Sequence, residues 1–224
     1  MYVMKVFIDT ETTGLVAPAL VEIAFAELGH EPLVLRCKPR KPIELDATVV
    51  NGIRNKDVAH LPLLADHPQY SWLKKHLEQS TIVAHNAPFD VGVLANEGIH
   101  VKSFIDTKEL AKKRWPNAPR HRLQHLRYWL DLEVDGADGI GPIAHTAGGD
   151  VKVLMALWQA LERKGKIDTY VQETLSTELQ QSQSPPPVQR SGSSVKNGRA
   201  PSRTLREQLR KRNAEKRSRP RKKP

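Results

Sequence analysis

Short apolar runs bounded by turn-forming residues recur along the first half of the chain. Branched and aromatic side chains are frequent in them, which is typical of β-strands. The runs lie at residues 3–8, 20–28, 33–37, 81–85 and 103–106. Helical patterns follow the last two runs, and this alternation of strand and helix predicts an α/β sheet.

Residues 147–164 carry the clearest helical pattern. Apolar side chains recur there every three or four residues, so they share one face of a helix. These are Val151, Leu154, Met155, Trp158 and Leu161. Gly165 follows and favours a helix end at that point.

Beyond about residue 180 the periodic pattern ends. The segment "QQSQSPPPVQRSGSSVKNG" is rich in Ser, Gln and Pro and has too few apolar residues to become ordered by burial. We therefore expect a folded domain over residues 1–175 and a disordered linker with a basic tail over residues 176–224.

The positive charge is concentrated in two segments. The formal net charge is +10, and residues 196–224 hold 13 Lys and Arg against two Glu, which leaves 22 basic and 23 acidic residues elsewhere. Within that nearly neutral remainder, residues 102–127 hold eight Lys and Arg against two acids. Basic segments attract phosphates, although residues 102–127 fit a solvated surface equally well.

Cysteine content and hydropathy indicate the class of protein. Cys37 is the only cysteine, so no intramolecular disulfide can form, which is typical of a reducing compartment. No apolar run is long enough to span a membrane, and Lys5, Asp9 and Glu11 interrupt the apolar region that a signal peptide would need. We expect a cytoplasmic protein with no membrane partner, whose fold begins at the N-terminus.

Acidic residues stand in three segments where regular elements begin or end: "DTETTG" at 9–14, "AHNAPFD" at 84–90 and "HTAGGD" at 145–150. In a strand, Asp9 and Glu11 would share one face, about 6–7 Å apart. Asp90 would lie at a helix start after the fourth strand, and Asp150 in the first turns of the last helix.

If these four acids meet, their mutual repulsion raises their pKa values unless cations lie between them. Two divalent ions would balance four negative charges. Oxygen ligands without cysteine favour Mg²⁺ or Mn²⁺ over zinc. A pair of such ions is the arrangement that stabilises the attacking and leaving oxygens in phosphodiester hydrolysis.

His145 precedes Asp150 by five residues, which corresponds to about 140° around an ideal helix. The two side chains therefore cannot reach one site from the same straight helix. The glycine-rich stretch 135–142 indicates that His145 belongs to a loop before the helix. A histidine that titrates near neutral pH beside a metal site suits a general base.

In order, spacing and residue type, the three segments resemble the DnaQ-like 3′→5′ exonucleases of the DEDDh type, in the RNase H-like superfamily, over residues 5–165. The resemblance implies a mixed five-stranded sheet flanked by helices. It implies that Asp9, Glu11, Asp90 and Asp150 bind two Mg²⁺ ions, which Mn²⁺ can replace, and that His145 activates the attacking water.

The same resemblance implies the activity: metal-dependent hydrolysis at nucleic-acid 3′ ends that releases nucleoside 5′-monophosphates. We expect DNA with a free 3′ end as the partner. Residues 110–119 and the compact length are most similar to the exodeoxyribonuclease X subfamily.

The resemblance also implies a pocket for the 3′-terminal nucleotide, with Leu15 as a wedge against the terminal base. The pocket residues would be Thr12, Gly14, Leu15, His85, Asn86 and Phe89. One triplet departs from the family, whose members commonly have His-Gly-Ile before the second motif where this chain has Asn51-Gly52-Ile53.

Taken singly, these residues have ordinary structural explanations. An isolated Asp9 or Asn86 is typical of a turn, and an isolated His145 of a surface or a satisfied core position. The joint occurrence of the four acids with His145 favours a site. For Leu15, Phe89 and Asn86 the structural explanation stays open.

Two other functions are compatible with the sequence. A non-catalytic nucleic-acid-binding adaptor is disfavoured because the full set of acids and the histidine are present. A proofreading subunit that docks on a polymerase would need apolar anchors, and the tail offers only Val195, Leu205 and Leu209. A free-standing nuclease is preferred, and a polymerase or other protein partner stays open.

Deletion of residues 183–224 tests whether the tail tethers nucleic acid. Because its cations attract phosphates without sequence preference, the truncated protein should show a higher KM for long substrates and a flatter salt dependence of binding. Cleavage of a dinucleotide should be nearly unchanged. Steady-state kinetics at several salt concentrations measure these effects. An unchanged KM and salt slope would leave only a solubility or nuclear-import role, and lost dinucleotide cleavage would place the tail in the active site.

Overall fold

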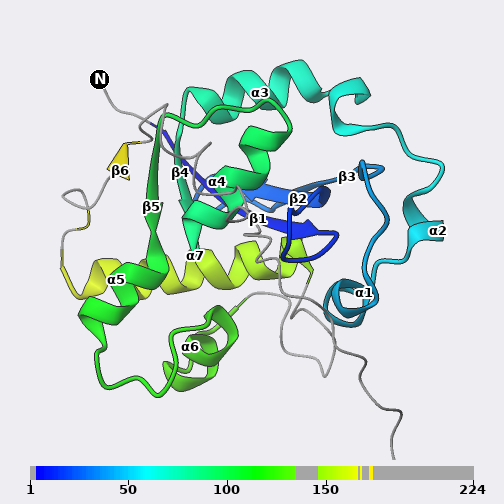
Figure 1. The fold of residues 1–224 in the computed structure, drawn as a ribbon. Coiled ribbons are helices and arrows are strands. Elements are labelled where there is room, and N and C mark those ends of the chain that lie inside the picture. The colour runs from blue at the N-terminus through cyan, green and yellow to red at the C-terminus, as the bar shows by residue number, and fades with distance from the viewer. Residues whose placement is uncertain (1–3, 135–145, 166, 168–171, 174–224) are drawn as a thin grey trace, which may run out of the picture. The chain divides into compact units, whose positions relative to one another are not determined.

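The computed structural model describes residues 4–134, 146–165, 167 and 172–173, all within one unit, Met1–Ser184. A six-stranded sheet in the order β3-β2-β1-β4-β5-β6 forms its centre (Figure 1). The strands are β1 (Lys5–Thr12), β2 (Leu20–Ala26), β3 (Leu33–Arg36), β4 (Thr81–Ala84), β5 (Ser103–Asp106) and β6 (Gln172–Glu173). The five expected strands are all present, and the two-residue β6 adds a sixth at the edge.

The sheet is mixed, as expected for an RNase H-like fold. β1, β2 and β3 pair antiparallel, whereas β1, β4 and β5 pair parallel and β6 is antiparallel to β5. Parallel neighbours require crossover connections, and helices supply them. The helices are α1 (Leu45–Asn51), α2 (Asn55–Val58), η1 (Leu64–Asp66), α3 (Tyr70–Glu78), α4 (Ala87–Asn96), α5 (Thr107–Arg114), α6 (Leu123–Trp129) and α7 (Ala147–Arg163).

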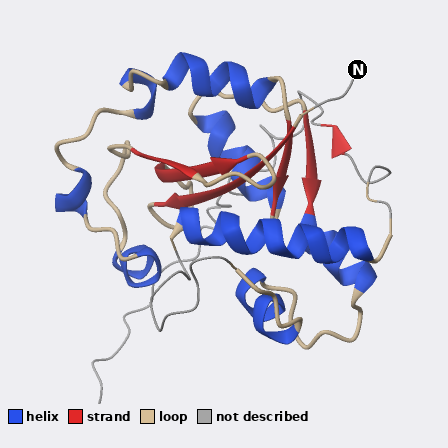
Figure 2. Cartoon of the chain, turned by 180° about the vertical axis from the view of Figure 1, so that it is seen from behind, coloured by secondary structure: helices blue, strands red, loops and turns tan. Residues whose placement is uncertain are grey.

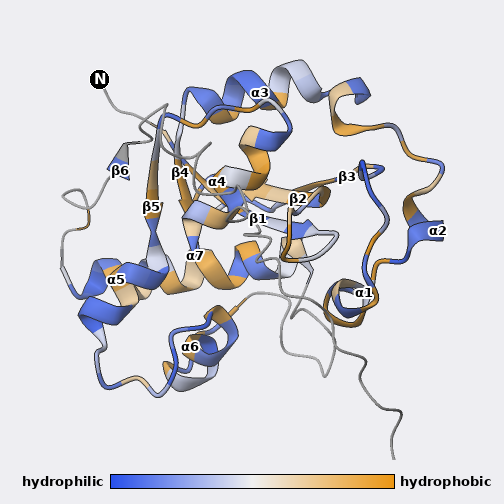
Figure 3. Ribbon diagram, in the orientation of Figure 1, coloured by the Kyte–Doolittle hydropathy of each residue, from blue (hydrophilic) through white to orange (hydrophobic). Residues whose placement is uncertain are grey.

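Helices cover both faces of the sheet, as the view from behind shows (Figure 2). Successive side chains of a strand point to opposite faces, and β1 follows this rule. Val6 and Ile8 join the core on the side of α3 and α4, whereas Phe7 joins the core under α7. Hydrophobic residues accordingly mark β4 and much of β5 in orange, whereas the edge strand β6 is hydrophilic and blue (Figure 3).

The last helix is the one that the apolar periodicity predicts. Its Trp158 is fully buried and meets Phe7 edge to face, with ring centroids 5.5 Å apart. Thr146 caps the helix by accepting a hydrogen bond from the Gly149 amide at 3.2 Å. At Gly148 a side chain would lie 3.1 Å from Val34 of β3, so glycine lets the first turn of α7 approach the sheet closely.

The sequence underestimates the length of the first strand. It predicts an end at residue 8, but β1 continues to Thr12 and stays paired with β2, with Asp9 opposite Ala24 and Glu11 opposite Glu22. The reason is that backbone pairing holds the strand while its side chains change from apolar to acidic. The predicted linker and tail, residues 176–224, lie outside the described residues, so the domain boundary stays a prediction. None of the described helices combines the length and apolarity needed to cross a membrane.

Candidate active site

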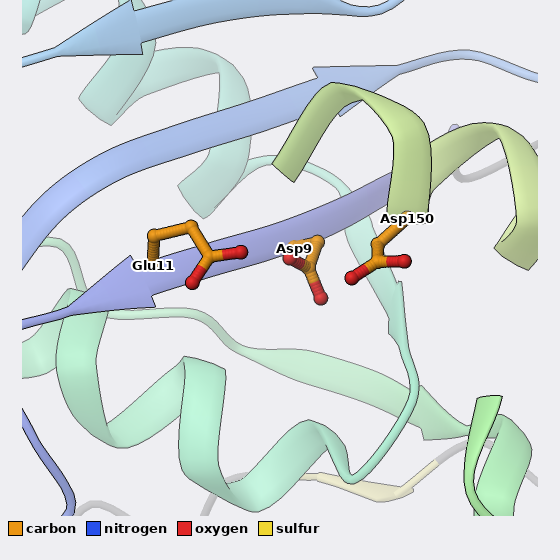
Figure 4. Close-up of side chains that lie close together, drawn as sticks. All are labelled: Asp9, Glu11 and Asp150. Carbon is orange, nitrogen blue, oxygen red and sulfur yellow. The ribbon is translucent and has the colours of Figure 1, made fainter. Parts of the chain in front are cut away.

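The acids of β1 meet an acid of α7. Asp9 and Glu11 continue the side of the strand that carries Phe7, and this side faces α7. The first turn of α7 carries Asp150. One carboxylate oxygen from each of the three residues lies within 4.8 Å of the others, and Figure 4 shows the three side chains pointing toward one another. The expected convergence of these three acids is therefore present.

Asp90 approaches the same end of β1 from α4. Pairing of β1 with β4 runs from Lys5 to Phe7, so the β1 backbone beyond that point needs other partners. Asp90, in the first turn of α4, accepts hydrogen bonds from the Thr10 amide at 3.1 Å and from its hydroxyl at 2.7 Å. These bonds fix Asp90 beside the strand that carries Asp9 and Glu11.

The clustered carboxyls are hard to ionise without a counter-charge. Burial raises the pKa of Glu11 to about 8, and the Asp150 and Glu22 charges add to this. Burial also raises the pKa of Asp90 to about 7, although the two hydrogen bonds from Thr10 act to lower it. The pKa of Asp9 is raised by burial and then by Asp90, Asp150 and its other acidic neighbours. Such a cluster is stabilised by cations placed between its members.

Glu22 is a member of this acidic group that the motifs do not reveal. It is buried on β2, directly opposite Glu11. Like charges in such a pair destabilise a sheet, and Arg36 on β3 offsets this, with its Nε 2.8 Å from the Glu22 carboxylate. The only sequence signal was a charged residue inside an otherwise apolar strand.

Asn51 stands where family members commonly have histidine. It is the buried last residue of α1, and its Oδ1 accepts a hydrogen bond from the Ile53 amide at 2.9 Å. Its Nδ2 lies 3.5 Å from the Thr12 carbonyl, and its hydrogen bond to Glu11 favours the ionised form of that carboxyl. The departure thus affects a residue that touches both an acid and the predicted nucleotide pocket.

Gln124 of α6 is a second contact that sequence analysis missed. Its Nε2 donates to the Asp150 Oδ1. Its Oε1 is buried, and no hydrogen-bond partner is found for it among the described residues. The residue ties α6 to the acidic site, and its spacing from the motifs gave no sign of this contact.

His85 has a structural role in the described geometry. Its Nε2 donates to the His121 carbonyl at 2.8 Å, and its Nδ1 lies 3.0 Å from the Thr107 hydroxyl. Burial lowers its pKa to about 4. Both ring nitrogens are engaged by the protein.

Asn86 is the turn former that its residue type suggests. It precedes α4 with a φ of 80°, a left-handed conformation that Asn tolerates. Its amide donates to Asp106 at 3.0 Å, and its Oδ1 accepts from Lys108 at 3.0 Å. Its side chain is exposed, so it is fixed by a lysine and still open to solvent.

The predicted wedge and pocket residues differ in exposure. Leu15 is 84% exposed in the β1–β2 turn, next to Val16, which is 79% exposed. Thr12 and Gly14 are buried beneath it, and Thr12 donates to the Gly14 carbonyl at 3.0 Å. Phe89 packs partly against the core of α3 and α4.

His145, the predicted general base, lies outside the described residues, as does the glycine-rich stretch 135–142. Its role stays a prediction. The described set of acids supplies oxygen ligands only, which suits a hard divalent cation.

Comparisons with known proteins agree with this geometry. The family model for exonucleases of the RNase T type matches residues 6–158. The DNA polymerase III subunit epsilon of Buchnera aphidicola is 32% identical over 132 residues, which cover 50% of this chain and 55% of that protein. An epsilon-like protein of Rhodobacter capsulatus is 30% identical over 71% of this chain and 24% of its own length. The chain thus spans about half, or less, of these relatives.

Solved structures show the same fold. Exonuclease X in complex with 5′ overhanging duplex DNA superposes with a TM-score of 0.58 at 26% identity, over 71% of this chain and 92% of that one. Exonuclease I of E. coli with a dT13 oligonucleotide has a TM-score of 0.56 at 16% identity, over 73% of this chain and 42% of its own.

The raised pKa values predict that the metal-free protein loses stability as the pH rises. Unfolded Glu and Asp have pKa values near 4.5 and 3.8, whereas Glu11 and Asp90 have folded values of about 8 and 7. Between about pH 4 and 8 the unfolded chain releases protons that the folded protein retains, so unfolding becomes easier. Mg²⁺ should reverse this effect, more strongly at pH 8 than at pH 5.

Thermal unfolding in EDTA measures the effect. Asp9→Asn removes one charge, so its midpoint should rise relative to wild type as the pH increases from 4 to 8. Asp46→Asn, at an exposed position of α1, is the matched control and should show no such trend. An Asp9→Asn difference that does not change with pH would contradict the repulsion.

Proposed function

Because the chain belongs to the exonuclease family, we propose that it is a metal-dependent 3′→5′ exonuclease that releases nucleoside 5′-monophosphates from DNA with a free 3′ end. The observation that carries this proposal is the convergence of Asp9, Glu11 and Asp150 within 4.8 Å, with Asp90 bonded to the same strand. An acidic cluster of this kind at the end of a central strand suits cation-assisted attack on a phosphodiester.

Members of this family depend on divalent metal ions, and the four acids would hold two Mg²⁺ ions, with Mn²⁺ as a substitute. Their oxygen-only chemistry and raised pKa values support this assignment. When bound, such a pair stabilises the attacking and the leaving oxygen during hydrolysis. Thr10 keeps Asp90 oriented through two hydrogen bonds, and Gln124 orients Asp150 through one.

His145 would act as the general base. It directly precedes Thr146, the residue that caps α7, and Asp150 follows in the first turn of that helix. In this role a neutral imidazole accepts one proton from the attacking water and passes it to solvent after cleavage. The leaving 3′ oxygen of the shortened strand takes up a proton in turn.

The predicted nucleotide pocket has one strong candidate contact. The exposed Leu15 suits stacking against a terminal base, above the buried turn of Thr12 and Gly14. Phe89 and Asn86 would complete the pocket, whereas the paired ring of His85 suits positioning of the chain before α4 better than direct contact with nucleic acid.

The two groups of relatives favour different settings for this activity. Likeness over 92% of the chain of Exonuclease X, which was solved with 5′ overhanging duplex DNA, supports a free-standing nuclease that acts on DNA. Likeness to epsilon subunits supports a proofreading subunit that binds a polymerase. We favour the first setting because the match covers nearly all of Exonuclease X and only part of the epsilon subunits.

Digestion of matched 5′-labelled strands tests the proposal. DNA with a free 3′ end should be shortened stepwise in Mg²⁺, the same strand with a blocked 3′ end should resist, and EDTA should stop the reaction.

Asp150→Asn should abolish cleavage with the fold intact, because it removes a ligand charge but little volume, whereas Asp46→Asn should cleave like wild type. RNA of the same sequence measures polymer preference. Wild-type rates in Asp150→Asn would overturn the site.

His145→Ala separates the base from the metal ligands. Loss of general base catalysis typically costs about 10²- to 10⁴-fold in turnover, and the variant should show this loss while its calorimetric affinity for Mn²⁺ stays that of wild type. A loss of metal affinity instead would make His145 a ligand and exclude the role of base.

A further inference from the structure

Helix α6 divides its side chains between the core and solvent in a way that core packing alone does not explain. Leu123, Leu126 and Leu130 lie on one side and pack against the cluster under α7. The opposite side carries His125, Tyr128 and Trp129, which fall within about 100° on a helical wheel. Tyr128 is 74% exposed and Trp129 is 43% exposed.

This exposed aromatic side begins at the acidic site. Gln124 donates to Asp150, and Tyr128 is four residues further along the same helix. Side chains at this spacing are neighbours, with Cβ atoms about 6 Å apart. A ligand that leaves the acidic site along α6 would therefore meet Tyr128 within roughly the length of one nucleotide.

Basic side chains precede α6 and lie within it, whereas exposed acids follow it at positions 131 and 133. The Arg127 guanidinium lies 5.3 Å from the centre of the Tyr128 ring, a cation–π arrangement. Arg120 and Arg122 precede the helix and are exposed. Exposed rings interleaved with arginine are the combination that proteins use to bind single-stranded nucleic acid, by stacking of bases and attraction of phosphates.

We propose that Arg122, Tyr128 and Trp129 form a stacking platform for the single-stranded part of the substrate, 5′ of the nucleotide in the acidic site. This proposal rests on the proposed function and assigns a binding role that the acidic motifs do not contain. The platform would retain the strand after each cleavage, because one or two of its bases stay stacked while the terminal nucleotide leaves.

Charge favours this occupant over the alternatives. The protein's own tail carries 13 Lys and Arg and would be repelled by these arginines. A protein partner would more often cover a continuous apolar surface, whereas this one alternates aromatic and basic residues. A strand that carries one phosphate per base matches both features.

Leucine substitutions remove the aromatic rings but keep apolar side chains and a high helix propensity. A double variant, Tyr128→Leu with Trp129→Leu, should bind a labelled dT12 strand at least about tenfold more weakly in Ca²⁺, since stacking on aromatic side chains is worth about 1–3 kcal/mol per base and 1.4 kcal/mol is tenfold. Trp72→Leu is the matched control, because Trp72 is half exposed but lies on α3. Tyr128→Phe should bind like wild type because it keeps the ring.

Tryptophan fluorescence and kinetics complete the test. Addition of dT12 should quench the emission of wild type and of Trp72→Leu, and most of this quenching should disappear in Trp129→Leu. The ratio of kcat/KM for dT12 to kcat/KM for a dinucleotide should fall about tenfold in the double variant.

An equal loss on both substrates, or quenching that persists without Trp129, would overturn the platform. The proposed function can fail separately. Binding and quenching that depend on Trp129, in a protein that does not shorten 3′ ends, would retain the platform and reject the exonuclease. Normal stepwise digestion by the double variant, with the wild-type ratio of kcat/KM values, would reject the platform and retain the exonuclease.

Discussion

The alternation of side chains along β1 is the constraint on which the rest of this structure depends. Phe7 points into the core under α7, and the next two side chains on that side are Asp9 and Glu11. One strand thus supplies a core contact and, within four residues, two acids of the site. Because α7 packs on Phe7 through Trp158, the same packing places Asp150 against those acids. The geometry of the site therefore follows from the packing of the core.

The opposite face of β1 completes the arrangement. Val6 and Ile8 are buried toward α3 and α4, and Thr10 continues that side as the strand passes the end of its pairing with β4. Thr10 then binds Asp90 of α4 through its amide and its hydroxyl. β1 in this way contacts helices on both faces of the sheet. α7 brings Asp150, and α4 brings Asp90, to the C-terminal part of β1. The repulsion among these acids lowers stability, and the two apolar cores that hold the helices offset it.

The sequence predicts most of this architecture because the elements and the acids leave local signals. Apolar runs located five strands, and the period of α7 located the helix nearly to the residue. The sequence also marks four acids, because three separate segments each place acids where a regular element begins or ends. These are Asp9, Glu11, Asp90 and Asp150. Gln124 left no such signal, and Glu22 left only that of a charged residue inside an apolar strand. Their roles depend on cross-strand register and on the packing of α6 beside α7, and these are long-range properties that no short segment encodes.

The acidic site creates a problem for the substrate that the remaining charges help to resolve. A cluster of carboxylates repels a polyanion, and the chain outside residues 196–224 is nearly neutral. Beyond the attraction that we expect from the basic tail, the acidic site therefore depends on local cations placed near the acids. One such cation is Lys108, which donates to Asn86 at the start of α4. The arginines before α6 are others. Their neighbour His121 accepts a hydrogen bond from His85 through its backbone carbonyl. The hydrogen bonds of His85 thus connect the start of α4, which carries Asp90, to the segment that carries these arginines. A substitution that loosened His85 would therefore shift the acids and the cations relative to each other.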